Sequence, residues 1–361
     1  MSNIKQTVFI TGAAGYVGAM LIERFAKRKD VAKIIGLDKE PVPEIIAGEQ
    51  KLIYIQGNTS DGKWESLARK HSPDIVIHTA WQIRDMYGDS AMQRKWNIYG
   101  SDAVFKFAFE EPSVTRLMYF SSVASYGAYA DNSVNRVFNE NDAFRKSDYR
   151  YAEEKRECEE HLQAQFETAK KDGNKTTVAI VRPAAITGPR GRFARIRFGL
   201  QSALSGQLKG SSVYRLVSLL TAFVPVTKEW TRQFVHEDDV YSIVELLSFA
   251  PRDGYEAYNL CPPGSPVRGS DMARAVGKRM IVIPTLFVRI AFFILWHITR
   301  GIVPTSRGAW KGYSYPIVVD GSKITRDYGY HYTISSYDAF YFTDGHYSSC
   351  VPKSAIRSRD I

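Results

Sequence analysis

A tyrosine and a lysine one helical turn apart are the residues of this sequence best suited to acid–base chemistry. They are Tyr151 and Lys155, in Tyr-Ala-Glu-Glu-Lys, and of the 21 tyrosines only Tyr151 has a lysine four residues later. Residues four apart share one face of a helix, so we expect the ammonium beside the phenol. A nearby positive charge favours the phenolate. The pKa of Tyr151, ordinarily about 10, should therefore be lowered toward neutrality, where the phenol can act as a base.

A glycine-rich segment close to the amino terminus predicts a dinucleotide site. Thr11-Gly-Ala-Ala-Gly-Tyr-Val-Gly18 lies between an apolar run typical of a strand and a run with helical periodicity. Gly12 permits a tight turn, Gly15 a close approach of the backbone to a pyrophosphate, and Gly18 close packing of the helix. The amino end of that helix adds free amides and a positive dipole. Together with the Tyr/Lys pair, this segment indicates hydride chemistry on a nicotinamide cofactor.

An acidic residue at the end of the second expected strand bears on the choice of cofactor. Asp38 stands twenty residues after Gly18. A carboxylate at this position binds the adenosine ribose hydroxyls and repels a 2′-phosphate, which favours NAD over NADP. Lys39 beside it opposes this choice, since a lysine can accept that phosphate.

Two further strand ends carry polar side chains. His78, in Ile77-His-Thr-Ala80, closes the fourth strand, and we interpret it as part of a network that supports a loop passing under the cofactor. Tyr119-Phe-Ser-Ser-Val-Ala-Ser-Tyr-Gly127 ends another strand in hydroxyls. A hydroxyl at the carboxyl end of a central strand can bind the reacting oxygen of a substrate. Spacing alone does not choose among these serines.

The segments that carry these residues alternate between strand and helix patterns. We expect strands at 8–11, 33–37, 52–56, 75–78, 116–121, 177–182, 234–235 and 257–260, and helices at about 16–27, 92–109 and 151–168. Strands that are apolar throughout and alternate with helices form a parallel sheet covered on both faces. The sequence therefore predicts an α/β fold, a doubly wound parallel sheet (Rossmann) with a smaller, mixed C-terminal substrate lobe.

The same patterns suggest how the chain is divided. We expect an NAD-binding domain at 1–190, to which the chain returns at about 232–260, and a substrate lobe made of 191–231 and 261–349. The polar residues 350–361 are predicted to be a disordered tail.

The formal net charge of +10 is concentrated in one stretch. From Arg182 to Arg232 there is one acidic residue and a net charge of +8, with lysines and arginines at 182, 190, 192, 195, 197, 209, 215, 228 and 232. The sequence shows no nucleic-acid recognition motif and no aromatic platform for single strands, so we expect no nucleic-acid partner. A phosphorylated small molecule needs the same positive field, and a solvated surface is the alternative.

Cysteine usage and the amino terminus bear on the compartment. The three cysteines, Cys158, Cys261 and Cys350, are far apart and have no metal-ligand spacing. This pattern fits a reducing compartment better than a disulfide scaffold or a metal site. Met1 leads within a few residues into an apolar strand and leaves no room for a signal peptide. We therefore expect a cytoplasmic protein without a bound metal.

The densely apolar segment 281–298 needs a separate interpretation. Pro284, Arg289 and His297 interrupt it, whereas a membrane-spanning helix requires about 20 consecutive apolar residues. We expect a buried helix or a dimer contact. A helix that lies in a membrane surface is the less favoured alternative.

In combination, these motifs resemble the extended short-chain dehydrogenases/reductases. The glycine pattern, His78-x-Ala80, Ser-Ser…Tyr-Gly127, Tyr151-x-x-x-Lys155 and Arg182-Pro…Gly188-Pro189 occur in the order of that family. Within it, the chain is most similar to the NAD-dependent epimerase/dehydratase group, including UDP-glucose 4-epimerase. The resemblance covers about 1–260 strongly and is loose beyond Pro262.

The resemblance implies roles for individual residues. It implies a catalytic set of Ser122, Tyr151, Lys155 and Asn97. It places the cofactor at Gly12, Ala14, Gly15, Tyr16, Val17, Gly18, Asp38, Asn58, Thr59, His78, Thr79, Ala80, Tyr151, Lys155 and Pro183. It places the substrate at Ser122, Arg190, Arg192 and Arg232.

The sequence also departs from the family pattern. Asn58 stands where the family usually has an acid near the adenine. Val123 and Ala124 replace the Asp-Glu pair that dehydratases carry, which argues against water elimination. The Gly-Asp-Gly that often precedes the arginine at 232 is absent.

The resemblance implies an NAD-dependent sugar-nucleotide epimerase, similar to UDP-hexose 4-epimerase, with a nucleotide-diphosphate sugar as substrate. We expect a homodimer by default. The alternative is an NAD(P)-dependent dehydrogenase or reductase of a steroid-like or lipid alcohol, similar to 3β-hydroxysteroid dehydrogenase. A non-catalytic NAD(P)-binding regulator is a third alternative.

Overall fold

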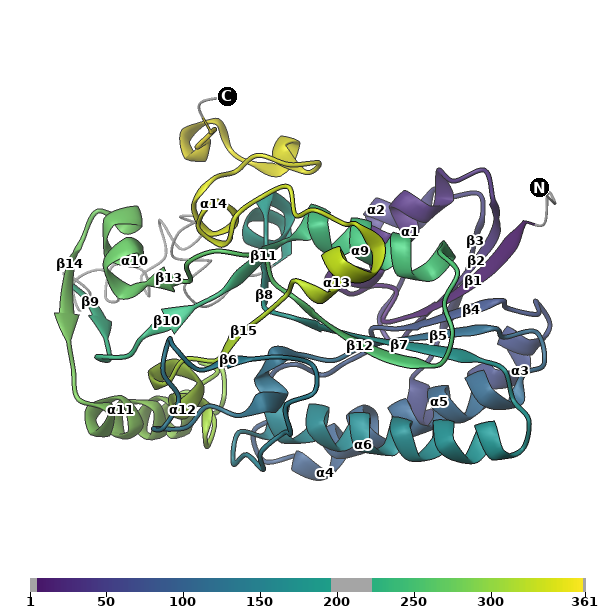
Figure 1. Cartoon of the computed structure of the whole chain (residues 1–361), viewed down its shortest axis with the longest axis horizontal. Helices are drawn as coiled ribbons and strands as arrows, with labels where there is room; N and C mark the ends of the chain where they lie inside the picture. Colours follow the sequence, from purple (N-terminus) through teal and green to yellow (C-terminus); the bar gives the residue numbers. More distant parts are fainter. Residues whose placement is uncertain (1–4, 196–222, 360–361) are drawn as a thin grey trace. The chain divides into compact units, whose positions relative to one another are not determined.

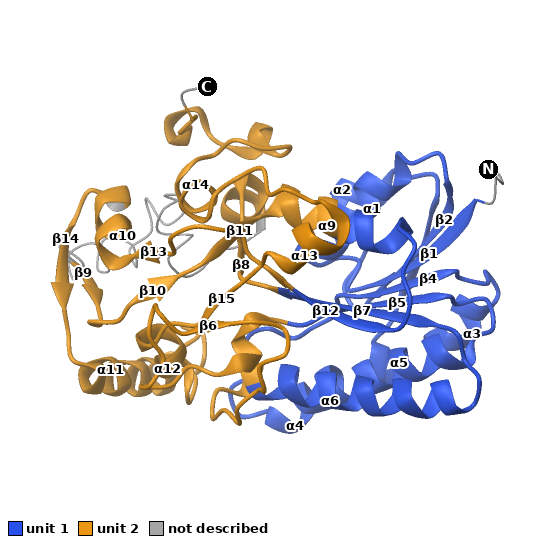
Figure 2. Ribbon diagram, viewed as in Figure 1, with its two compact units in different colours: residues 1–121, 153–182, 244–258 blue, residues 122–152, 183–243, 259–361 orange. Residues whose placement is uncertain are grey.

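The computed structural model describes residues 5–195 and 223–359, and the chain forms two compact units (Figure 1 and Figure 2). Unit 1 consists of residues 1–121, 153–182 and 244–258, and unit 2 of residues 122–152, 183–243 and 259–361. The chain therefore re-enters unit 1 twice. The excursion at 122–152 is a feature that the sequence patterns did not indicate.

Unit 1 is built on a seven-stranded sheet in the order β12-β7-β5-β4-β1-β2-β3. The pairs β1/β2, β1/β4, β2/β3, β4/β5 and β5/β7 are parallel. The strands are β1 (Gln6–Thr11), β2 (Val31–Asp38), β3 (Leu52–Gln56), β4 (Ile75–His78), β5 (Arg116–Phe120), β7 (Thr177–Pro183) and β12 (Tyr255–Leu260). This order reverses between β1 and β4, where doubly wound sheets bind their ligands. The predicted fold class is confirmed.

Helices cover both faces of this sheet (Figure 1). On one face, α1 (Tyr16–Ala26) lies beside the last turns of α9 (Glu237–Phe249), where the rings of Phe25 and Phe249 are 5.5 Å apart. On the other face lie α3 (Lys63–Arg69), α5 (Gly100–Glu110) and α6 (Arg150–Lys171). The core on this side includes Phe9, Trp64, Phe107 and Leu162. The short α2 (Glu44–Ala47) follows β2.

The helix expected over 92–109 is interrupted by a π-helical turn. It begins as α4 (Ser90–Arg94), continues as the turn η2 (Lys95–Tyr99) and resumes as α5. A π turn accommodates an extra residue within a helix and is frequent at functional sites. Here it contains Asn97, which is fully buried.

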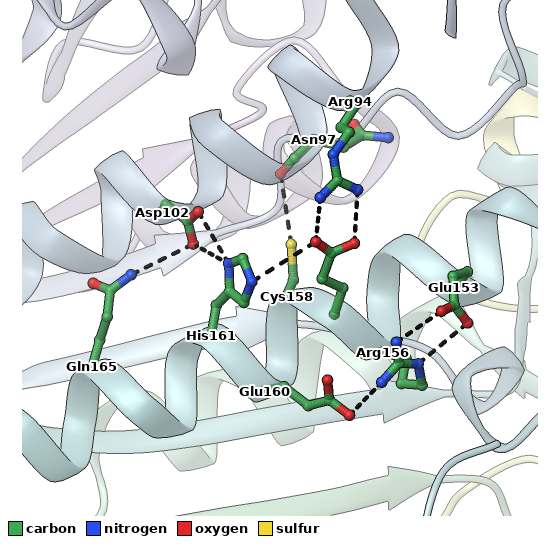
Figure 3. A network of polar contacts seen from close by, with 10 residues as sticks. Arg94, Asn97, Asp102, Glu153, Arg156, Cys158, Glu160, His161 and Gln165 are labelled. Carbon is green, nitrogen blue, oxygen red and sulfur yellow. Dashed lines mark hydrogen bonds and ion pairs between the residues drawn. The ribbon is translucent and has the colours of Figure 1, made fainter. Parts of the chain in front are cut away.

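Polar contacts fix α6 against the helix that precedes it (Figure 3). His161 Nδ1 lies 3.0 Å from Asp102 Oδ1, and Arg94 forms an ion pair with Glu157. Cys158 Sγ lies 3.7 Å from the carbonyl oxygen of Asn97. These contacts hold the helix that carries the Tyr/Lys pair.

Unit 2 consists of short strand pairs and helices. The parallel pairs are β8 (Ala185–Thr187) with β11 (Phe234–His236), β9 (Phe223–Val226) with β14 (Arg279–Val282), and β6 (Val137–Phe138) with β15 (Val318–Val319). The antiparallel pair is β10 (Thr231–Arg232) with β13 (Val267–Arg268). The helices are α10 (Gly269–Val276), α11 (Thr285–Ile298), α12 (Ala309–Ser314), α13 (Lys323–Tyr328) and α14 (Ser336–Tyr341). A separate core includes Trp230, Phe234, Met272 and Phe340.

The sequence predicts a buried helix or a dimer contact for the segment 281–298, and the first of these two predictions is wrong. Its first residues belong to β14 and the rest forms α11, in which Val288 is buried but Phe287 and Phe293 are exposed. Within residues 5–195 and 223–359, every helix is too short or too polar to cross a membrane.

The segment from Cys350 onward, for which the sequence predicts disorder, is described as far as residue 359. It contains the short helical turn η6 (Lys353–Ala355), and η5 (Ser348–Cys350) precedes it. The backbone amides of Arg357 and Arg359 donate to Thr343 Oγ1 and Asp344 Oδ2, at 2.8 and 2.9 Å.

The tight packing of α1 on the glycine-rich loop makes a stability prediction. A Cβ atom at Gly18 would lie 2.1 Å from the carbonyl oxygen of Gly12, so the backbone must shift. We expect Gly18→Ala to lower the free energy of unfolding by about 1–3 kcal/mol, as overpacking does. Gly48→Ala is the control, because a Cβ there meets no atom within 4 Å. Urea unfolding of both variants measures the effect, and equal stability of the two would contradict the prediction.

Candidate active site

The loop after β1 has the shape of a phosphate cradle. Gly12 has a φ of +74°, and a Cβ there would lie 2.6 Å from the amide nitrogen of Ala80. The Gly15 amide donates to the Gly12 carbonyl at 2.8 Å, and Gly15 is the N-cap residue of α1. No described side chain caps α1, and its first turn, which begins with Tyr16 and Val17, contains no acidic residue. The first amides of α1 can therefore bind an anion, and the glycines leave the space that a pyrophosphate needs.

The carboxylate of Asp38 lies at the end of β2, next to this loop. Its Oδ2 accepts from the amide of Ala14 at 2.9 Å, and its Oδ1 accepts from the amide of Glu40 at 3.0 Å. The amine of Lys39 lies 4.2 Å from the centre of the Trp96 ring and 3.5 Å from Glu40 Oε1. Lys39 therefore has an anionic and an aromatic neighbour of its own, which weakens the argument for a bound 2′-phosphate.

Asn58 and Thr59 form the turn that follows β3. Asn58 Oδ1 accepts from the amide of Ser60 at 2.9 Å and so caps the turn η1 (Thr59–Asp61). Thr59 is buried against α5, where a Cβ on Gly100 would lie 2.3 Å from its Oγ1. The amide side chain at 58 thus has a local structural role in addition to any contact with adenine.

His78 joins the ends of β1 and β4. Its Nδ1 lies 2.6 Å from Thr11 Oγ1 and its Nε2 2.8 Å from Ser101 Oγ. Burial, with a further contribution from Lys155, lowers the pKa of His78 to about 3, so the ring is neutral near pH 7. Thr79 Oγ1 donates to the Thr11 carbonyl at 2.7 Å. This network fixes the backbone at the ends of β1 and β4, the two strands between which the strand order reverses.

Lys155 is buried, with 4% of its surface exposed. Its amine donates to the carbonyl of Phe120 and lies 3.4 Å from Tyr119 Oη and 3.6 Å from the centre of the Trp81 ring. Burial lowers the pKa of Lys155 to about 7, although Cys158, Glu159 and Glu154 oppose the shift. The amine can therefore gain or lose a proton near neutrality.

Tyr151 lies one turn earlier on α6 and is half-buried. Burial raises its pKa above the ordinary value, and a hydrogen bond with Ser122 opposes the shift. The expected lowering of this pKa is therefore wrong for the protein without a bound ligand, because burial outweighs the favourable influences. Ser122 also accepts from the amide of Ala124 at 3.1 Å. Its hydrogen bond to the phenol distinguishes Ser122 from its neighbours in the serine-rich turn.

Asn97 is part of a buried polar clamp whose other members the sequence did not indicate. Its Nδ2 donates to Glu154 Oε2 at 2.7 Å and to the carbonyl of Gln82 at 3.1 Å. Gln93, one turn earlier, donates to Asp85 Oδ1 at 3.1 Å. Glu154 is buried although it looks like a solvated charge in the sequence of α6. Trp81, the neighbour of Lys155, could have been found only as the residue that follows the His-x-Ala motif.

The basic residues of the segment 182–232 have different surroundings in the structure. Arg182 forms a buried ion pair with Glu159 at 2.7 Å. Arg192 donates to the carbonyls of Phe340 and Tyr341, both at 3.2 Å, and is almost completely buried.

The other two candidate arginines, Arg190 and Arg232, lie in unit 2. Arg190 lies 5.4 Å from the centre of the Tyr347 ring, and its backbone amide donates to Glu237. Arg232 lies 5.4 Å from the centre of the Trp230 ring. Pro183, expected at the cofactor, is the last residue of β7. The basic residues at 197, 209 and 215 lie outside the described part of the chain.

Comparisons with known proteins identify the family and the fold of the chain. The family model for the NAD dependent epimerase/dehydratase family matches residues 8–261. A curated relative, sterol-4-alpha-carboxylate 3-dehydrogenase (decarboxylating) of Candida albicans, is 25% identical over 304 residues, which is 81% of this chain and 80% of the relative. An uncharacterized protein of Mycobacterium tuberculosis is 21% identical over 98% of this chain and 88% of its own length.

Solved structures share the fold. The enzyme WbmG of Bordetella bronchiseptica in complex with NAD and UDP has a TM-score of 0.66 at 22% identity, over 93% of each chain. UDP-glucose 4-epimerase of Thermotoga maritima with UDP-glucose has a TM-score of 0.66 at 18% identity, over 92% of this chain and 96% of that chain. The family match covers well over half of the sequence and contains the glycine-rich loop and the Tyr/Lys pair. The chain therefore belongs to the NAD-dependent epimerase/dehydratase family, and it is an NAD-dependent enzyme of the extended short-chain dehydrogenase/reductase type.

Proposed function

We propose that this enzyme is an NAD-dependent sugar-nucleotide epimerase, similar to UDP-hexose 4-epimerase, that acts by transient oxidation of a sugar hydroxyl. The choice of substrate rests on the surroundings of the Arg232 guanidinium, which has carbonyl partners but no carboxylate partner among the described residues. Its guanidinium donates to the carbonyl of Thr231 at 2.8 Å and to that of Gly312. Burial lowers its pKa to about 10, and the groups that oppose the shift are the phenols of Tyr313 and Tyr149.

A half-buried guanidinium without a carboxylate partner is well suited to bind an anion. Among the described residues, no aspartate or glutamate forms an ion pair with Arg232. A buried charge is costly unless it is paired, and a diphosphate matches the fork of an arginine. Arg192 is almost completely buried and donates to the carbonyls of Phe340 and Tyr341, whereas Arg232 is half-buried and an anion can reach it. Arg232 is therefore the best candidate for the diphosphate anchor.

The proton transfer is assigned to Tyr151 and Ser122. Ser122 holds the sugar oxygen and the phenol. The positive charges of the nicotinamide and of protonated Lys155 would oppose the burial that raises the pKa of Tyr151, so that its phenolate can take the hydroxyl proton as the carbon–hydrogen bond is broken. The loop of Gly12 and Gly15, with Asp38, would hold NAD, which would supply a reversible hydride acceptor for this carbon. The keto-sugar turns over before the hydride returns, and Tyr151 gives back the proton, so the sugar ends with inverted configuration and the cycle is redox-neutral.

Lys155, Asn97 and the glycine-rich loop support this reaction. The protonated amine of Lys155 provides positive charge next to the turn of α6 that carries the phenol. Asn97, through Glu154 and Gln82, holds the start of α6 and the loop after β4. Gly12, Gly15 and Asp38 would hold the pyrophosphate and the adenosine ribose.

The turn after Ser122 argues against a dehydratase. Val123 and Ala124 begin the turn η3 (Val123–Tyr126) and cannot exchange protons. Water elimination needs an acid and a base on the substrate in addition to the tyrosine. An epimerase needs neither.

The alternative is a dehydrogenase of a steroid-like or lipid alcohol. The curated relative from Candida albicans and the apolar exposed side of α11 favour it. The two functions differ in how the cofactor is used. Purified protein that releases near-stoichiometric NAD on denaturation supports the epimerase, because its cofactor is recycled in place. Protein that binds NAD only reversibly supports the dehydrogenase.

Removing the phenolic oxygen tests the catalytic assignment. We expect Tyr151→Phe to reduce the interconversion of UDP-glucose and UDP-galactose by at least about 100-fold, since general acid–base catalysis contributes about 10²–10⁴. NAD affinity should remain within about twofold, because the cradle is unchanged. Tyr99→Phe, at an exposed phenol, is the matched control. Normal turnover by Tyr151→Phe would eliminate this mechanism.

Removing the guanidinium tests the substrate class. Arg232→Met should weaken UDP binding about 10- to 100-fold in isothermal titration, as expected for loss of a charged hydrogen bond worth about 1.5–3 kcal/mol. The control is Arg326→Met, at an exposed arginine that pairs with Asp320. Unchanged UDP affinity, or no UDP binding by the wild-type protein, would favour the dehydrogenase.

The buried amine makes a pH-dependent prediction. Between the folded pKa of about 7 and the ordinary value of 10.5, the unfolded chain binds a proton at Lys155 that the folded chain does not. The destabilisation caused by this lysine is therefore complete below pH 7 and is relieved as the pH rises. We expect the stability advantage of Lys155→Met over the wild type to shrink by about 2–3 kcal/mol from pH 7 to pH 9, at about 1.4 kcal/mol per pH unit.

Urea unfolding of the nucleotide-free protein at the two pH values measures this change. Lys106→Met is the control, because Lys106 is exposed and should give the same difference at both pH values. A pH-independent difference for Lys155→Met would mean that the folded pKa of Lys155 is ordinary.

A further inference from the structure

Exposed apolar side chains are concentrated in one short stretch of unit 2. Among the described residues, eleven of the twenty large hydrophobic side chains that are exposed lie between 280 and 302. Seven of the eleven belong to α11: Leu286, Phe287, Ile290, Phe293, Ile294, Leu295 and Ile298. Scattered exposed apolar residues are ordinary, but a gathered set marks a surface that binds something apolar.

The inner side of α11 already has its protein contacts. Val288 is buried, and Phe292 and Trp296, four and eight residues later, are half-buried. The ring of Phe292 lies 5.6 Å from that of Tyr313. Spacings of four residues place these side chains on one face of the helix. The outer side, where Phe287 is 61% and Phe293 64% exposed, is therefore a second apolar face.

The strand before α11 also exposes apolar side chains. All four residues of β14 (Arg279–Val282) are exposed, including Met280, Ile281 and Val282. β14 leads directly into α11 (Figure 1). Ile302, just after the helix, is also exposed. We call the exposed large hydrophobic residues of 280–302 the apolar face.

The charges around the apolar face have one sign. Between Asp271 and Asp320 the sequence contains seven lysines and arginines and no acidic residue. Arg279 in β14, Arg289 in α11 and Arg300 just after it are exposed. Apolar side chains bordered by cations complement a lipid surface with anionic head groups, and each cation near such a surface strengthens binding.

We propose that the apolar face docks this enzyme on the surface of an anionic phospholipid bilayer, with α11 lying in the interface. A helix of 14 residues is about 21 Å long, shorter than the hydrocarbon core of about 30 Å, so α11 lies in the surface and does not cross. Phe287 and Phe293 enter the acyl region, while Arg279, Arg289 and Arg300 contact phosphates. This inference does not rest on the proposed function.

A second copy of the chain is the less suitable occupant. In a two-fold symmetric contact the same patch meets itself, so the cations of one copy would lie close to those of the other. Like charges at an interface are unfavourable, whereas an anionic lipid surface neutralises them.

Co-sedimentation with vesicles tests the proposal. The full-length protein is mixed with phosphatidylcholine vesicles that either contain or lack phosphatidylserine. We expect binding to the phosphatidylserine vesicles that falls with added salt. The double variant Phe287→Ser/Phe293→Ser should bind at least tenfold more weakly. Arg279→Gln/Arg289→Gln should also bind more weakly, by about fivefold for each cation removed.

The control carries the same kind of change on another surface. Ile45→Ser/Leu67→Ser replaces two apolar side chains of unit 1 that are 38% and 41% exposed and should bind as the wild type does. Circular dichroism melting confirms that each variant is folded. Absence of wild-type binding at low salt, or unchanged binding by the phenylalanine variant, overturns the proposal. Self-association without vesicles that Phe287→Ser/Phe293→Ser abolishes would also overturn it, in favour of a second copy.

Discussion

Two adjacent charged residues buried at the start of α6 are the constraint on which the site depends. Glu154 and Lys155 each have 4% of their surface exposed, so each must find partners within the protein. Glu154 accepts from Asn97, which lies in the π-helical turn η2, and Lys155 donates to the carbonyl of Phe120 at the end of β5. Because these partners come from different elements, the helix has one position in which both charges are satisfied. The Tyr/Lys pair is oriented as a consequence.

The cofactor cradle depends on a different constraint, the absence of side chains. Gly12 and Gly18 occupy points where the backbone of another segment, or of the same loop, comes too close for a Cβ atom. His78, neutral because it is buried, holds the neighbouring strand end through Thr11. Both constraints involve only groups of the chain itself, so we expect the loop to keep this shape when no ligand is bound.

The strong positive charge of the chain is divided among several tasks. Arg182 neutralises the buried Glu159, and Arg192 donates hydrogen bonds to backbone carbonyls. Arg232 is half-buried, donates to the carbonyls of Thr231 and Gly312 and has no carboxylate partner among the described residues. Arg279 and Arg289 border the apolar face. A net charge therefore described the chain correctly but did not predict which cations bind phosphate, because that depends on what surrounds each of them.

Local patterns in the sequence determined the parallel sheet, the glycine-rich loop and the Tyr/Lys spacing, since each depends on residues that are neighbours in the chain. Only the tertiary structure decided that Ser122 bonds to Tyr151, that Glu154 is buried and that burial raises the pKa of Tyr151. It also decided that α11 exposes an apolar side, although the sequence suggested a buried helix. Hydrogen bonding, burial and exposure are set by segments far apart in the sequence, and periodicity along one segment does not contain that information.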